Sequence, residues 1–429
     1  MSLGQTSATG IQKLSPEVLD LIFDALADEK RGEEHEIIPA LTACRLVSRS
    51  FSSFATPRAF KTAKLHCFGW KYREHNSGER AAHNHARKFL RLLEANPALA
   101  KWVRVLDLTS RMGQSSWIGT SKTLHLILPK LVNMQHLIID VYNGGLFWGA
   151  RMKRDLANAF LAAFQLPSLK TLKVMNVVHF PLDTFFPLKK GTTTTGSTSL
   201  ESLTLCAYTL QNLSRFSLPE HPTVCTIKKL RLSYKCYNSY SSSQNWTDME
   251  PSWLKLAAKL SDTLKELEIF NAGSLSSDQL TEKWPSGDSL SILKNLESLT
   301  LLCAPKSAHG TFDIPFPPGF AKALESSTPM PSVKSLCLTF SVSWVISTYP
   351  MWQLTEGWDA LPDLLCSMFP QLSSLVLRFQ MSNFIGGGKS TKTPEEMKEH
   401  FCEVLSGIKK TCPALPVKVL VLQECEFMV

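Results

Sequence analysis

The feature that most constrains the fold of this 429-residue chain is a short apolar phrase that recurs ten times. Each copy has an apolar residue, two variable residues, a central leucine, one variable residue and another apolar residue. The central leucines are Leu106, Leu137, Leu172, Leu203, Leu230, Leu267, Leu299, Leu336, Leu375 and Leu420. Apolar residues that alternate with period two indicate a half-buried strand. One such strand cannot bury its apolar side alone, so we predict that the copies stack into a continuous sheet.

The segments between these phrases are expected to form an outer layer. Residues 151–164, 253–261 and 394–410 have helical patterns, whereas the stretches 191–199, 239–245 and 304–320 are rich in small or turn-forming residues and indicate loops. The whole pattern resembles a leucine-rich repeat solenoid with long, irregular repeats. The usual repeat has Asn or Cys five residues after the central leucine, and here only Cys425 fits, so we expect non-standard turns.

The first sixty residues have a different pattern. Ser15 is a good N-cap and Pro16 suits the first position of a helix. This helix would carry a wide apolar stripe made of Val18, Leu19, Ile22, Phe23 and Leu26. A helix this short is not stable alone in water. Part of the stripe can be covered by Leu41, Leu46, Val47, Phe51 and Phe54, and we expect the remainder to face a partner protein.

The sequence Leu-Ser-Pro-Glu at 14–17, followed by Cys-Arg-Leu-Val-Ser-Arg-Ser-Phe at 44–51, resembles an F-box over residues 11–60. The F-box is a three-helix module that docks on the Skp-type adaptor of cullin ubiquitin ligases. The resemblance implies adaptor-facing or core roles for Leu14, Pro16, Ile22, Leu26, Cys44, Val47 and Phe51. Two positions depart from the family, since Ser48 stands where Cys is common and Phe51 where Trp is common.

Charge is unevenly distributed. Residues 1–57 have five Lys/Arg against eight Asp/Glu, a balance of −3, whereas residues 58–104 have eleven against three, a balance of +8. A basic segment of this kind can bind nucleic acid or phospholipid. However, Ala86, Phe89, Leu90 and Leu93 give it one apolar helical face and no nucleic-acid signature is present, so we interpret the charges as the solvated side of a helix.

We therefore expect an α/β protein with four parts. These are a disordered N-terminus (1–10), an F-box (11–60), a basic helical linker (61–100) and a leucine-rich-repeat-like solenoid (101–429). Outward strand positions are candidate substrate-binding sites, and the side chains concerned are Lys173, Arg231, Glu268, Phe270 and Arg378. The loops 304–320 and 381–393 are equal candidates.

The sequence contains no good catalytic motif. The run Gly-Gly-Gly-Lys-Ser-Thr at 386–391 resembles a phosphate-binding loop, but Asn383 occupies the place of the required glycine. His83 and His85 are two apart in a predicted helix and do not share a face, which disfavours a metal site. We expect no enzymatic activity, cofactor or metal.

The absence of a long apolar run and of a secretion pattern, with eleven scattered cysteines, predicts a cytoplasmic or nuclear protein with reduced thiols. The resemblance implies a substrate receptor of a Skp–cullin–F-box ubiquitin ligase that binds an unknown target protein. The alternatives are an adaptor-binding scaffold outside any ligase, or a nucleic-acid or phospholipid binder through the 58–104 segment.

Overall fold

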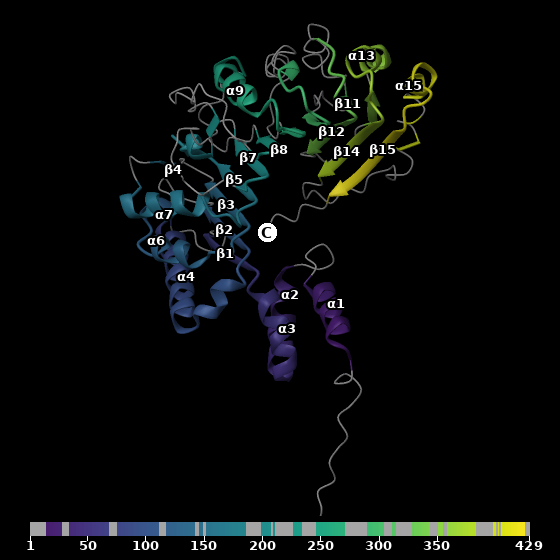
Figure 1. Ribbon diagram of the computed structural model, residues 1–429. Coiled ribbons are helices and arrows are strands. Elements are labelled where there is room, and N and C mark those ends of the chain that lie inside the picture. The colour runs from purple at the N-terminus through teal and green to yellow at the C-terminus, as the bar shows by residue number, and fades with distance from the viewer. Residues whose placement is uncertain are drawn as a thin grey trace, which may run out of the picture.

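The computed structural model describes the chain from residue 14 to residue 424, apart from residues 28–33, 68–74, 111–116, 142–145, 149–151, 186–198, 207–208, 211–225, 234–245, 271–289, 304–310, 315–327, 344–350, 355–357, 383–397, 400–401 and 403–404. Within these residues one large parallel sheet dominates, and its strands follow one another in chain order. The sheet bends into an arch that opens downward in Figure 1. The protein is thus a mixed α/β structure, consistent with a repeat solenoid.

The strands of the sheet are β1 (Thr62–Cys67), β2 (Val105–Ser110), β3 (His136–Val141), β5 (Thr171–Met175), β7 (Ser202–Cys206), β8 (Lys229–Ser233), β9 (Glu266–Phe270), β10 (Ser298–Cys303), β12 (Ser335–Ser343), β14 (Ser374–Ser382) and β15 (Val417–Glu424). Two short pairs lie apart from it, namely β4 (Leu146–Phe147) with β6 (Val177–Val178), and β11 (Thr311–Ile314) with β13 (Met351–Leu354). The strand β11 corrects our expectation that 304–320 is entirely loop.

The strand register confirms nine of the ten phrases. The central leucines of the first nine lie directly opposite one another in successive strands, from Leu106 to Leu375. The tenth phrase also forms a strand of the sheet, β15, but its expected register is wrong, because Leu375 pairs with Val417 and not with Leu420. A shift of three residues reverses which side chains face inward. Accordingly, Val419 is buried in the core.

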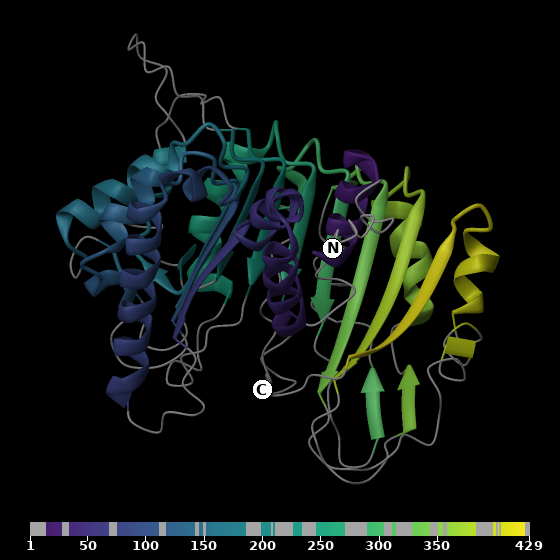
Figure 2. The same ribbon diagram turned by 90° about the horizontal axis from the view of Figure 1, so that it is seen from below.

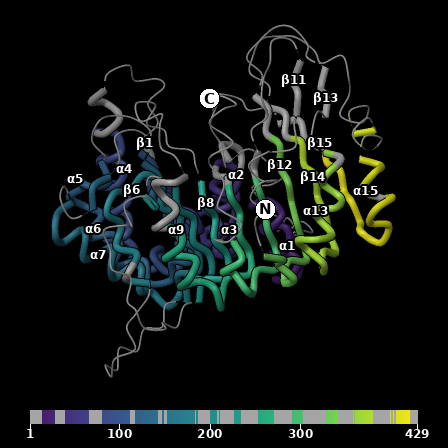
Figure 3. The backbone as a smooth tube through the Cα atoms, turned by 90° about the horizontal axis from the view of Figure 1, so that it is seen from above, coloured from purple at the N-terminus to yellow at the C-terminus, as the bar shows by residue number. Residues whose placement is uncertain are grey.

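Helices cover the outer side of the arch (Figures 1 and 3). They are α4 (His75–Ala95), α5 (Trp117–Thr120), α6 (Leu124–Ile127), α7 (Arg154–Phe164), α9 (Trp246–Leu260), α13 (Leu361–Met368) and α15 (Ser406–Thr411), with 3-10 turns η2 (Pro97–Lys101), η3 (Leu128–Lys130), η4 (Leu182–Phe185) and η6 (Trp358–Ala360). The expected helices at 151–164 and 253–261 are confirmed with other bounds, since α7 begins at Arg154 and α9 extends from Trp246 to Leu260. The third is described only in part, and the expected loops 191–199 and 239–245 and the run 386–391 lie almost entirely outside the described residues.

The main core lies between the sheet and these helices. Alternate strand residues such as Leu172 and Val174 point into it and are fully buried. Aromatic rings fill the space where α7 meets η4, and successive rings are 5.5–6.1 Å apart; they belong to Trp148, Phe160, Phe164, Phe180 and Phe185. The opposite, concave face of the sheet carries the polar strand residues.

The segment 61–100 is part of the repeat body, which corrects our expectation of a linker. β1 is the first strand of the sheet and pairs in parallel with β2. α4 buries Ala82, Ala86, Leu90 and Leu93 in the main core. Its basic residues Arg87, Lys88 and Arg91 are exposed, as the apolar face of this helix predicts.

Polar side chains just before the strands form a ladder of hydrogen bonds at the N-terminal ends of the strands, which is the end of the sheet opposite the turns where the usual Asn or Cys would stand. Each stands four residues before a central leucine and donates a hydrogen bond to a carbonyl of the preceding repeat. Asn133 donates to the Lys101 oxygen at 3.0 Å, and Ser168 to the Val132 and Met134 oxygens at 2.8 Å. The side chains of Ser199, Thr226 and Asn295 donate hydrogen bonds of the same kind. This ladder ties each turn to the preceding repeat through carbonyls that are exposed or half-buried.

Candidate protein-docking surface

Three N-terminal helices form a separate subdomain below the opening of the arch (Figures 1 and 2). They are α1 (Pro16–Leu26), α2 (Glu34–Val47) and α3 (Arg49–Ala59). Phe23, Leu41 and Ala55 form a small core that is distinct from the main one. The Phe23 ring meets the Phe51 ring edge-on at 5.6 Å and stacks on the Phe54 ring at 6.1 Å. A helical unit of residues 14–60 therefore packs largely against itself.

Serine side chains cap two of these helices. The Ser15 hydroxyl accepts a hydrogen bond from the Val18 N–H at 3.4 Å, with Pro16 in the first turn, as the sequence predicts. The Ser48 hydroxyl accepts one from the Phe51 N–H at 3.1 Å and starts α3. A serine at position 48 is thus useful here, because it satisfies an N–H that the helix cannot pair internally.

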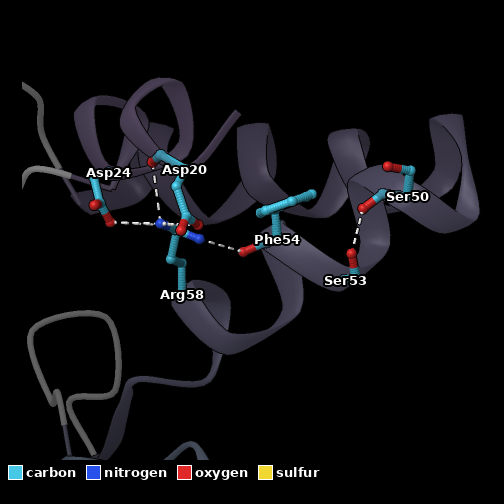
Figure 4. Close-up of polar contacts among 6 residues, drawn as sticks. All are labelled: Asp20, Asp24, Ser50, Ser53, Phe54 and Arg58. Atoms are coloured by element: carbon cyan, nitrogen blue, oxygen red, sulfur yellow. Dashed lines mark hydrogen bonds and ion pairs between the residues drawn. The ribbon is translucent and has the colours of Figure 1, made fainter. Parts of the chain in front are cut away.

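Arg58, at the end of α3, holds α1 in place (Figure 4). Its guanidinium donates to the Asp24 carboxylate at 2.9 Å and to the Asp20 carboxylate at 2.9 Å. It also donates to the main-chain oxygens of Asp20 at 3.1 Å and Phe54 at 2.9 Å. Only 14% of the Arg58 side chain is exposed, so this charge depends on its partners. Nothing in the sequence pattern identified this residue.

An apolar ridge remains open to solvent on this subdomain. It consists of Leu14, Val18, Leu21, Ile22 and Leu26 along α1, with Leu46 and Val47 at the end of α2. Leu21 is 70%, Val47 68% and Leu46 85% exposed, and the others are 36–42% exposed. At 100° per residue, the α1 members span roughly 140° of the helix surface, beside the buried stripe of Leu19 and Phe23. The helix is apolar on two sides, and the described residues cover only one of them.

The ridge includes most of the residues that the F-box resemblance selects. Leu14, Ile22, Leu26 and Val47 belong to it, and Pro16 next to Leu14 is exposed. For the remaining two residues, Cys44 and Phe51, the resemblance implied either an adaptor-facing role or a core role. The structure gives both of them core positions. Cys44 and Phe51 are half-buried and pack against Phe23, Leu41 and Ala55, so a direct adaptor contact by either one is not supported.

Three other apolar residues of the subdomain, Leu21, Leu46 and Val47, differ in exposure from what the sequence predicts. Leu46 and Val47 do not cover α1 as we expected, because both point to solvent. Leu21 was absent from the predicted stripe and is one of its most exposed members. A wider angular window around the stripe would have included it.

The charged substrate candidates on the concave face are paired with neighbouring strands. Lys173 forms an ion pair with Asp140 at 2.9 Å, and Arg231 forms one with Glu268. Lys229 lies 2.8 Å from Glu268. Burial alone would lower the pKa of the Lys229 ammonium, but its hydrogen bonds to Glu268 and Glu266 outweigh that effect and raise the pKa. These charges are largely neutralised within the sheet.

The other two candidates share one row of the sheet, two residues further along the strands than the row of Lys173, Arg231 and Glu268. Phe270 is the last residue of β9 and pairs with Leu302, but its side chain is outside the described part. Arg378 is half-buried on β14, and its buried Nε has no hydrogen-bond partner within the described residues. The structure thus does not bring the five candidates together into one cluster.

The described residues offer no metal site and no membrane span. No group of His, Cys, Asp and Glu side chains among them could hold an ion. His83 stacks edge-on against Trp117 at 6.0 Å, whereas His85 is exposed. No helix in the described part is long and apolar enough to cross a membrane.

Comparisons with known proteins leave the family open. No family model matches this chain, and no curated protein matches its sequence. A chain from the crystal structure of the Rad7 and Elc1 complex in yeast is 14% identical, with 90% of this chain and 95% of that chain covered and a TM-score of 0.26. That TM-score does not establish a common fold, so the conclusions below depend on the residues of this chain alone.

Proposed function

We propose that this protein is a substrate receptor of a Skp–cullin–F-box ubiquitin ligase. The observation that carries the proposal is the apolar ridge, which lies on the helices whose sequence resembles an F-box. Monomeric proteins rarely leave such a row of large apolar side chains in water, and rows of this kind mark protein interfaces. The Skp-type adaptor is the partner that the sequence resemblance assigns to this surface.

The size of the ridge fits such an interface. Its seven side chains have exposed fractions that together equal roughly four fully exposed large apolar residues. Covering them gains about 6–12 kcal/mol before the cost of association. Association costs several kcal/mol. The ridge would therefore supply a large share of the free energy of a stable complex, with polar contacts at its edge completing it.

In this proposal the repeat body recognises the target protein. Its concave face opens toward the docking subdomain (Figure 1), so a bound target would lie on the same side of the molecule as the adaptor. The row of Lys173, Arg231 and Glu268 crosses this face and offers mixed charge to a polypeptide. The chain itself would perform no chemistry, and ubiquitin transfer would belong to its ligase partners in the cytoplasm or nucleus.

The test is co-purification of cullin with the full-length chain, scored together with ubiquitination of co-purified proteins. The test variant is Leu14→Ala with Pro16→Ala, and the matched control is Leu126→Ala with Val132→Ala, which removes exposed apolar groups from the repeat body. We expect the test variant to lose adaptor, cullin and ubiquitination while the control keeps all three. Adaptor without cullin would indicate a scaffold outside any ligase, and equal capture by both variants would refute the docking role of the ridge.

A further inference from the structure

Two thiols meet where the helices of the last two repeats pack together. The helices are α13 and α15, which lie side by side on the outer face of the sheet (Figure 1). Cys366 belongs to α13 and is exposed, whereas Cys412 is the C-cap residue of α15 and is half-buried. No part of the proposed function uses either thiol.

The contacts of Cys412 bring its sulfur to the turn of α13 that carries Cys366. The Cys412 thiol donates to the main-chain oxygen of Pro362, with 3.9 Å between sulfur and oxygen. Pro362 is one helical turn before Cys366, and a helical side chain leans toward the turn before it. The Cys366 side chain therefore extends toward the Cys412 sulfur, and a side-chain hydrogen bond joins the two thiols.

The surroundings give the two sulfurs different roles. Burial raises the pKa of the Cys412 thiol to about 11, and the hydrogen bond and charge of Cys366 and the charge of Asp363 act in the same direction. Cys412 therefore keeps its proton near neutral pH. Cys366 is exposed, so an oxidant in solution reaches it first. An accessible thiol beside a second thiol is the arrangement found in cysteines that respond to oxidants.

We propose that Cys366 and Cys412 form a reversible disulfide in response to a peroxide, and that this bond holds the last repeat against the one before it. The Cys366 thiolate attacks one oxygen of hydrogen peroxide, so an S–O bond forms, the O–O bond breaks, and hydroxide leaves and takes up a proton to become water. The Cys412 sulfur then attacks the Cys366 sulfur. An S–S bond forms, the S–O bond breaks, and the hydroxide leaves with the Cys412 proton as a second water. Two thiols are oxidised and one peroxide is reduced, and a dithiol reverses the change by thiol–disulfide exchange.

The position of the pair gives the bond a structural effect. α13 leads into β14 and α15 leads into β15, and among the described strands β15 pairs only with β14. A repeat with a neighbour on one side only is less stabilised than an inner repeat, so it opens more easily. Opening of the last repeat separates α15 from α13, and a covalent bond between these helices prevents that separation. Oxidation would thus stabilise one end of the concave face, independently of the adaptor-docking role.

The first test treats the reduced full-length chain with a small molar excess of hydrogen peroxide, followed by digestion and mass spectrometry without reduction. We expect a linked pair of peptides that contain Cys366 and Cys412, with the mass of two hydrogen atoms lost, and we expect dithiothreitol to separate them. Cys366→Ser and Cys412→Ser should each abolish this link. Cys402→Ser is the matched control, because it removes another exposed thiol of the same region and should leave the link intact.

The second test measures amide hydrogen exchange of the same samples. Peroxide should slow exchange in β15 at least about tenfold in wild type and in Cys402→Ser, and dithiothreitol should restore the original rate. Exchange in β15 should not respond to peroxide in Cys366→Ser or Cys412→Ser. The proposal is overturned if Cys366 and Cys412 do not become linked, if either one pairs mainly with Cys402 or another cysteine, or if the link forms while exchange in β15 stays unchanged.

Discussion

Removing the Arg58 side chain should release α1 from the docking subdomain. The guanidinium donates four hydrogen bonds to α1 and α3, two of them to the carboxylates of Asp20 and Asp24. Those carboxylates are 58% and 69% exposed, so each ion pair is screened and contributes at most about 1 kcal/mol. The carbonyl contacts and the packed stem add about 1 kcal/mol more. We therefore expect Arg58→Ala to destabilise the attachment of α1 by about 2 kcal/mol.

Amide hydrogen exchange of the full-length chain measures this directly, because it reports opening region by region. About 2 kcal/mol corresponds to roughly thirtyfold faster exchange in α1. The strands of the sheet should exchange as before. Arg58→Lys should be intermediate, since a lysine keeps the charge but not the forked geometry. Arg49→Ala, which removes an exposed arginine from the same helix, is the control.

The reasoning would be refuted if α1 exchanged at the same rate in Arg58→Ala and in wild type. It would also be refuted if Arg49→Ala had the same effect. Equal acceleration in α1 and in the strands would show that the docking subdomain does not open separately from the body.

Three other predictions concern the surface, the turns and the pH response. Leu46→Asp should leave the thermal midpoint of unfolding within about one degree of wild type, because the side chain is exposed; a large decrease would contradict this. Ser168→Ala should lower the free energy of unfolding by about 1 kcal/mol in urea titration, because it leaves two carbonyls without their donor; no change would contradict the role of the turn ladder. Burial, with the nearby charges of Lys61 and Lys170, lowers the pKa of His136 below its ordinary 6.5. The unfolded chain therefore binds a proton more readily, so the free energy of unfolding should fall as the pH drops below 6.5 and level off below the folded-state pKa. His136→Gln should remove this part of the pH dependence, and an unchanged profile would contradict it.

The sheet could be predicted from the sequence because its signal is repeated. A single apolar phrase is ambiguous, but nine phrases with a common spacing locate nine strands, and the structure has their central leucines in register. The tenth phrase also forms a strand, but its register was wrong because the segment contains apolar residues at both Val417 and Leu420, and pattern alone does not decide which of them faces inward. β1 was missed because Ala63 and Leu65 are too few to stand out from a basic segment.

The docking surface was only partly predictable. Helix periodicity shows that α1 is apolar on a wide arc, but it does not reveal which part of the arc the chain itself covers. Phe51 packs against the small core and Leu46 is exposed to solvent. Which apolar side chains are buried depends on how α2 and α3 cross α1, and helix periodicity does not give that crossing. The contacts of Arg58 join residues 34 and 38 positions apart, and no local pattern indicates a pair at that distance.

The central claim is that the apolar ridge binds a Skp-type adaptor, and isothermal titration of purified adaptor into the full-length chain tests it most directly. We predict a one-to-one complex with a dissociation constant between nanomolar and micromolar and a negative heat-capacity change, as burial of apolar surface requires. The double variant Leu21→Asp with Leu46→Asp should abolish the binding heat while the chain remains folded. Absence of binding by the wild-type chain, or equal binding by the double variant, would contradict the account.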